Sequence, residues 1–188
     1  MSVQVHDTRE GYGWVAITLH WLTAVLVIAL WLLGERMGFQ LTRELQNAAQ
    51  ALHVSYAVFA WPFLVAFVLW RLTHKSPALT GHWALTLLAR LVQGLLLLAI
   101  AIQVITGPLT VWSMKQPISA FGLFEIPSPM TFTHDQHELL EATHTTTANV
   151  ILVLVVIHVL GALKHLFIDK DGVFERMMGI NKGGAASK

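Results

Sequence analysis

The sequence predicts an all-α fold, an integral membrane four-helix bundle with both termini in the cytoplasm. Of its 188 residues, 55% are hydrophobic and only 12% are charged, whereas a soluble domain carries about 25% charged residues. Four long apolar segments each approach or exceed the ~20 residues that a helix needs to cross a bilayer. The Lys and Arg residues between these segments are unevenly distributed, which indicates orientation. We interpret residues 1–188 as a single transmembrane domain.

The four predicted spans cover residues of about 14–34, 52–72, 83–112 and 143–166. Helices are expected in all four, because a helix satisfies its own backbone hydrogen bonds in lipid. The first span lacks a strongly basic leading region and is long enough to span, which argues against a cleavable signal peptide. Pro62 lies within the second span and is expected to kink it.

Two connections are too long to be simple turns. Residues of about 35–50 contain T-R-E-L-Q-N-A-A-Q, which favours a helical lead-in to the second span. Residues of about 113–142 contain three prolines and the stretch A-F-G-L-F. Both lie on the side opposite the termini, where either could fold over the bundle as a lid.

The basic residues predict the orientation. One side of the four-span topology carries Arg9, Arg71, Lys75, Arg90, Lys164, Lys170, Arg176, Lys182 and Lys188, and the other carries Arg36, Arg43 and Lys115. Cytoplasmic segments are enriched in Lys and Arg, so both termini are expected in the cytoplasm. The net charge of +1 gives no reason to propose a nucleic-acid partner.

Four histidines within the spans resolve into two pairs. His144 and His158 are separated by ~21 Å of helical rise and point from the same face. His20 and His158 each lie ~9 Å inside the predicted cytoplasmic boundary of their spans, whereas His53 and His144 lie roughly 27–30 Å from it. His20 therefore matches His158 in depth, and His53 matches His144.

Paired imidazoles on facing helices are the axial ligands that a haem iron needs. With both axial positions filled, such a haem passes electrons and does not bind oxygen. The chain has no cysteine, which excludes disulfides, thiolate ligands and covalent haem attachment. A zinc site would need three or four clustered ligands, whereas these pairs lie ~21 Å apart. A single histidine in a span could instead bond a neighbouring helix.

The remaining histidines and the glycines carry weaker predictions. His137 and His165 are interpreted as interfacial, with proton transfer as an alternative for His165 and solvation expected for His137. Gly161, one turn after His158, is the preferred position for room beside a flat macrocycle. Trp21 adjoins His20 and could wall the same site. The other histidines are expected in loops or solvent: His6, His74, His82 and His134.

These residues resemble the bacterial cytochrome b561 family, small four-helix dihaem proteins of the inner membrane. The matching elements are I-T-L-H-W around His20, A-L-H-V-S around His53, A-F-G-L-F in the outer loop, the span from His144 to His165 and the closing F-I-D-K-D-G-V-F-E-R-M-M. The resemblance implies two haems b, with His20 and His158 on the inner iron and His53 and His144 on the outer one. This agrees with the pairing by depth. Some relatives carry a histidine where this chain has Arg90.

The resemblance also implies an activity, superoxide oxidation. Superoxide would arrive from the periplasm, and ubiquinone would collect its electrons. Superoxide is an anion, and basic groups near a cleft raise anion on-rates by about 10–10³-fold. Lys115 is the candidate substrate-guiding residue, with a solvated surface lysine as the alternative.

Two other functions remain open at this point. The chain could be an electron-transfer subunit that links the quinone pool to a partner oxidoreductase, without superoxide chemistry of its own. It could also be a structural or transport protein with coincidental histidines, which predicts a colourless preparation.

Overall fold

Four long helices form the body of the protein in a computed structural model that describes residues 5–8, 11–77 and 82–180. The helices are α1 (Trp14–Gly38), α2 (Arg43–Thr73), α3 (Trp83–Ser113) and α4 (His134–Lys164). All four are long and apolar enough to cross a membrane, counted over the described residues, with α4 continuing to Asp169. The predicted all-α membrane bundle is confirmed.

The helices extend beyond the predicted spans because the polar residues that cap their N-terminal ends lie outside the apolar segments. The side chain of Thr42 accepts a hydrogen bond from the backbone N–H of Leu45 at the start of α2. Thr133 and Gln136 form a reciprocal capping box at the start of α4, a pattern that satisfies two orphan donors of the first turn. The helix α4 therefore begins before the predicted span of about 143–166, whose bounds in the membrane stay a prediction. The helical lead-in to the second span is confirmed from Arg43.

Two prolines lie inside helices, Pro62 in α2 and Pro108 in α3. Neither ends its helix. Proline is tolerated in membrane helices because neighbouring groups satisfy the carbonyl that loses its partner.

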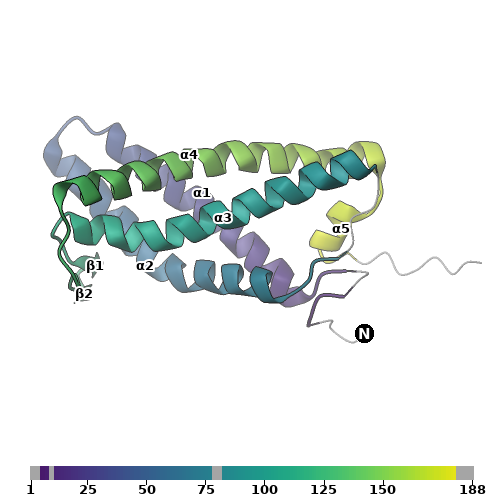
Figure 1. The fold of residues 1–188 in the computed structure, drawn as a ribbon, viewed down its shortest axis with the longest axis horizontal. Coiled ribbons are helices and arrows are strands. Elements are labelled where there is room, and N and C mark those ends of the chain that lie inside the picture. The colour runs from purple at the N-terminus through teal and green to yellow at the C-terminus, as the bar shows by residue number, and fades with distance from the viewer. Residues whose placement is uncertain (1–4, 9–10, 78–81, 181–188) are drawn as a thin grey trace, which may run out of the picture.

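The start of α1, the end of α2, the start of α3 and the end of α4 lie at one end of the bundle (Figure 1). After α4 the chain forms a π-helical turn (His165–Asp169) and the short helix α5 (Val173–Met177) at this same end. The structure describes six of the basic residues assigned to this side, whereas Arg9, Lys182 and Lys188 lie outside the described residues. The side of the membrane on which this end lies stays a prediction.

A small antiparallel hairpin occupies the opposite end of the bundle, between α3 and α4 (Figure 1). It pairs β1 (Ile118–Ala120) with β2 (Phe124–Ile126), and Ala120 faces Phe124. Phe121 and Gly122 both have positive φ angles, 52° and 71°, as tight hairpin turns require. The A-F-G-L-F stretch is therefore the turn of a hairpin.

The hairpin is fastened to α2 by one buried serine. Ser55 accepts a hydrogen bond from the N–H of Phe121 at 2.9 Å and donates one to the carbonyl of Ser119 at 3.3 Å. The Phe121 ring lies edge-on to Tyr56, with centroids 5.1 Å apart. The outer connection thus packs against α2 at Ser55 and Tyr56.

Candidate cofactor site

The first histidine pair joins α1 to α4. The imidazole centroids of His20 and His158 lie 6.1 Å apart, with an interplanar angle of 61°. Both residues are half-buried. Trp21 meets His20 edge-on at 5.4 Å, and its indole N–H donates to the carbonyl of Met177 in α5. The structure therefore brings together the two histidines that the depth argument matched near the termini.

The second pair joins α2 to α4 near the hairpin. The imidazole centroids of His53 and His144 lie 6.5 Å apart and their planes are perpendicular, at 90°. A Cβ built at Gly34 would lie 3.6 Å from Cε1 of His53, and one at Gly107 would lie 3.5 Å from Cε1 of His144. Both distances are ordinary van der Waals contacts, so these two positions of α1 and α3 lie directly beside the imidazoles.

Both separations fit an iron held between two imidazoles. Histidine nitrogens bind metals such as zinc at about 2.0–2.1 Å, and an iron bound similarly between two rings places their centroids about 6 Å apart. The two observed separations, 6.1 and 6.5 Å, agree with this value. A zinc site gains no support here, because the one metal-type cluster of three ligands in the described residues is elsewhere, at His165, Asp169 and Asp171.

Two polar residues of α3 hold α4 at His144, and the sequence analysis missed both. Gln103 Nε2 donates to the carbonyl of His144 at 2.8 Å. The hydroxyl of Thr106, which is buried, lies 3.1 Å from Nδ1 of His144. The sequence did carry a signal for these two residues, because polar residues recur every three or four positions along one face of the otherwise apolar α3.

Gly161, the glycine that the sequence analysis preferred, is exposed, and no side chain or neighbouring helix lies within 4 Å of a Cβ built there. This open space is compatible with room beside a macrocycle at Gly161, which stays a prediction. The glycines that lie against histidine rings are Gly34 and Gly107.

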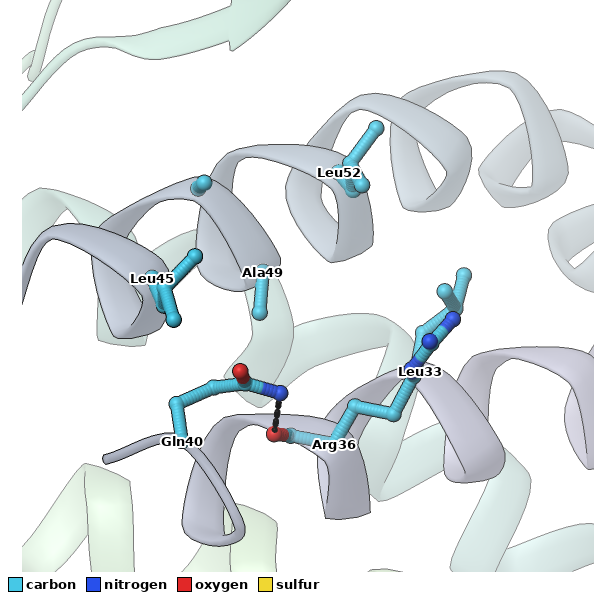
Figure 2. Close-up of a pocket in the computed structure, with 7 residues that line it drawn as sticks. Leu33, Arg36, Gln40, Leu45, Ala49 and Leu52 are labelled. Atoms are coloured by element: carbon cyan, nitrogen blue, oxygen red, sulfur yellow. Dashed lines mark hydrogen bonds between the residues drawn. The ribbon is translucent and has the colours of Figure 1, made fainter. Parts of the chain in front are cut away.

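A shallow groove lies between the end of α1 and the start of α2 (Figure 2). Its volume is about 190 Å³, and it is lined by Leu33, Arg36, Gln40, Leu45, Ala48, Ala49 and Leu52. Leu33 directly precedes Gly34 and Leu52 directly precedes His53. Arg36 is the cation of this lining, and its carbonyl accepts a hydrogen bond from the Gln40 side chain at 2.8 Å.

Lys115 lies directly after α3, exposed and with a left-handed φ of 59°. Its neighbour Met114 accepts a hydrogen bond from Gln50 of α2, with Nε2 and Sδ 3.4 Å apart. Lys115 therefore belongs to the hairpin end, as predicted. No contact between its ammonium group and either histidine of the outer pair is present in the described structure.

Of the six histidines outside the two pairs, three lie on α4 or directly after it. The prediction that His137 is solvated is wrong: its side chain is only 25% exposed, and Nδ1 lies 2.8 Å from Oγ of Ser113. His134 is solvated as expected, at 79% exposure. His165 lies 2.9 Å from Asp171, and Lys164 pairs with Asp169, so these four residues form an ion-pair network beneath α5.

The model of the prokaryotic cytochrome b561 family matches residues 11–179. The chain belongs to the prokaryotic cytochrome b561 family. It is 35% identical over 179 residues to cytochrome b561 homolog 2 of Escherichia coli (strain K12), covering 92% of this chain and 94% of that protein. It is 28% identical over 188 residues to the probable superoxide oxidase CybB of Yersinia pestis, covering 93% and 99%.

Membership of the cytochrome b561 family establishes the general role. The protein is a multi-pass protein of the bacterial inner membrane that binds haem b and carries electrons. The two histidine pairs are the candidate residues for holding that cofactor.

Proposed function

We propose that this cytochrome b561 is a superoxide:ubiquinone oxidoreductase with two haems b. His20 and His158 hold the inner iron, and His53 and His144 hold the outer one. Residues 1–188 form one transmembrane domain around both. The observation that carries this proposal is the presence of two imidazole pairs at metal-bridging separations, 6.1 and 6.5 Å. The name of the Yersinia pestis relative supports superoxide as the donor.

The stoichiometry follows from the electron count. Two superoxide anions each give up one electron and become O₂, and one ubiquinone takes both electrons and two protons to become ubiquinol. Haem would supply one-electron carriers at these sites, with His20 and His158 holding one group and His53 and His144 the other.

The residues of the hairpin end would bring superoxide to the outer pair. The cations of this end are Arg36, Arg43 and Lys115, and all three are exposed. Positive charge near a cleft focuses anions and raises their rate of arrival. Arg36 is the best placed of the three, because it lines the groove between the end of α1 and the start of α2.

The test uses the detergent-purified holoprotein. The extractable haem b per chain is measured first, and pulsed superoxide is then supplied with ubiquinone as acceptor. We expect two haems per chain, rapid reduction by superoxide and reoxidation by ubiquinone. Two haems that ignore superoxide but accept electrons from ubiquinol would instead support a subunit that serves a partner oxidoreductase. A colourless protein would contradict the haem assignment as a whole.

A further inference from the structure

The same hydroxyl–imidazole contact occurs twice along the interface of α3 and α4. Ser113 Oγ lies 2.8 Å from Nδ1 of His137, and Thr106 Oγ1 lies 3.1 Å from Nδ1 of His144. The two hydroxyl residues are seven positions apart on α3, and the two histidines are seven positions apart on α4. The same hydroxyl–imidazole contact therefore recurs after two helical turns along the antiparallel helices α3 and α4.

The hydrogen-bond directions at Thr106 are determined by its neighbours. Its hydroxyl donates to the carbonyl of Ile102 at 2.8 Å, so the single hydroxyl proton is used. Towards His144 the oxygen must then accept, and Nδ1 of His144 carries the hydrogen. This tautomer leaves Nε2 of His144 with the free lone pair that a metal ligand needs.

The repeat ends before it reaches the inner histidine. Each further step of seven residues along both helices gives the next facing pair. The first step places Ala99 opposite Ile151, and the second places Val92 opposite His158. Ala99 and Ile151 are both buried in one apolar cluster, and Val92 is also buried. Valine cannot accept a hydrogen bond, and the His158 ring makes none in the part of the chain that the structure describes. The two histidines of α4 therefore differ in the partner that α3 offers them.

We propose that Thr106 is a positioning residue that sets the tautomer of His144 and lowers the midpoint potential of the outer haem relative to a site without the hydroxyl. This inference rests on the proposed role of His144 as an outer ligand. An acceptor on the remote ring N–H fixes the orientation of a metal-bound histidine and raises its basicity. A more basic ligand stabilises the oxidised, more positive iron. The hydroxyl thus makes the outer site the stronger electron donor.

The test is a spectroelectrochemical titration of the purified holoprotein with three variants. Thr106→Val removes the acceptor at nearly constant shape, Thr106→Ser keeps it, and Val92→Thr offers a hydroxyl to His158. The outer haem is assigned by comparison with His158→Ala, which is expected to retain only that haem.

We expect Thr106→Val to favour reduction of the outer haem about tenfold, which is an upward shift of about 59 mV for one electron. Thr106→Ser should keep the potential of the unmodified protein, and Val92→Thr should lower the inner potential alone. If Thr106→Val lost the outer haem while Thr106→Ser kept it at the original potential, the positioning role would also be supported.

Two results would overturn the proposal. One is an unchanged outer potential in Thr106→Val with both haems bound. The other is an equal disturbance in Thr106→Val and Thr106→Ser, because packing and not hydrogen bonding would then be the cause. The titration uses no superoxide, so its failure is independent of the donor assignment. A His144→Ala protein that kept both haems would instead contradict the ligand set itself.

Discussion

At the scale of single residues, four imidazoles are the unusual feature of this chain. Ionisable side chains are rare within membrane spans because burial in hydrocarbon is unfavourable, and those present mark functional sites. Here each of the four faces another across a helix–helix interface, at 6.1 or 6.5 Å. A shared iron would explain why these ionisable side chains lie within the spans and why they lie in pairs.

Removal of one imidazole should therefore remove one haem. We expect His158→Ala to lose the inner haem and keep the outer one, because the two pairs share no residue. The measurement is the ratio of extractable haem b to chain, together with the reduced-minus-oxidised spectrum. His134→Ala is the matched control, since that histidine is 79% exposed on the same helix. An unchanged haem ratio in His158→Ala would contradict the inner ligand assignment.

The charge of Arg36 should matter for the arrival of an anionic donor. We expect Arg36→Gln to lower the second-order rate of haem reduction by superoxide about two- to tenfold at low ionic strength. The difference should shrink towards 1 M salt, where the screening length falls to about 3 Å. The measurement is pulsed-superoxide kinetics across a salt series.

Two variants complete that experiment. Lys115→Gln tests the residue that the sequence analysis selected, and we expect a smaller decrease because Lys115 does not line the groove. Lys75→Gln removes an exposed charge beyond α2, at the opposite end, and should leave the rate unchanged. A larger effect for Lys115→Gln than for Arg36→Gln would return the guiding role to Lys115.

At the scale of secondary-structure elements, the conformation of the hairpin between α3 and α4 depends on its contact with Ser55 of α2. Ser55 is buried and bonds both Ser119 of β1 and Phe121 of the turn. Phe121 has a left-handed φ of 52°, which is unfavourable for a residue with a Cβ. The hairpin conformation is thus maintained by α2 rather than by its own three-residue strands.

We expect Ser55→Ala to loosen the hairpin without unfolding the bundle. The N–H of Phe121 would lose its part-buried hydrogen bond, at a cost of about 0.5–1.5 kcal/mol. Hydrogen exchange in residues 118–126 should become faster, while exchange in α3 and α4 stays unchanged. Thr131→Ala, at an exposed position of the same connection, is the control. Unchanged hairpin protection in Ser55→Ala would show that the aromatic contacts of Phe121 suffice.

At the scale of the whole molecule, orientation follows from charge and not from packing. The bundle would pack equally well in either direction across the membrane, whereas Lys and Arg are retained on the cytoplasmic side. We expect a reporter that is active only in the periplasm to work when fused after Gln116 and to fail when fused after Gly179. The reverse pattern would contradict the predicted topology.

The sequence by itself determined the four spans and the depths of the histidines. Both follow from the rise of a helix per residue and from the thickness of the bilayer, and neither depends on neighbouring helices. Depth was sufficient to match His20 with His158 and His53 with His144, and the structure brings the same residues together. The ligand roles of these four stay a prediction until haem content is measured.

Only the tertiary structure decided which other residues touch the pairs. Gly34 and Gly107 lie against the outer imidazoles, Thr106 bonds one of them, and Ser55 bonds the hairpin to α2. Each contact depends on how far one helix is rotated and shifted against the next. Periodicity shows which residues share a face of a helix, but it does not show which residue of another helix that face meets.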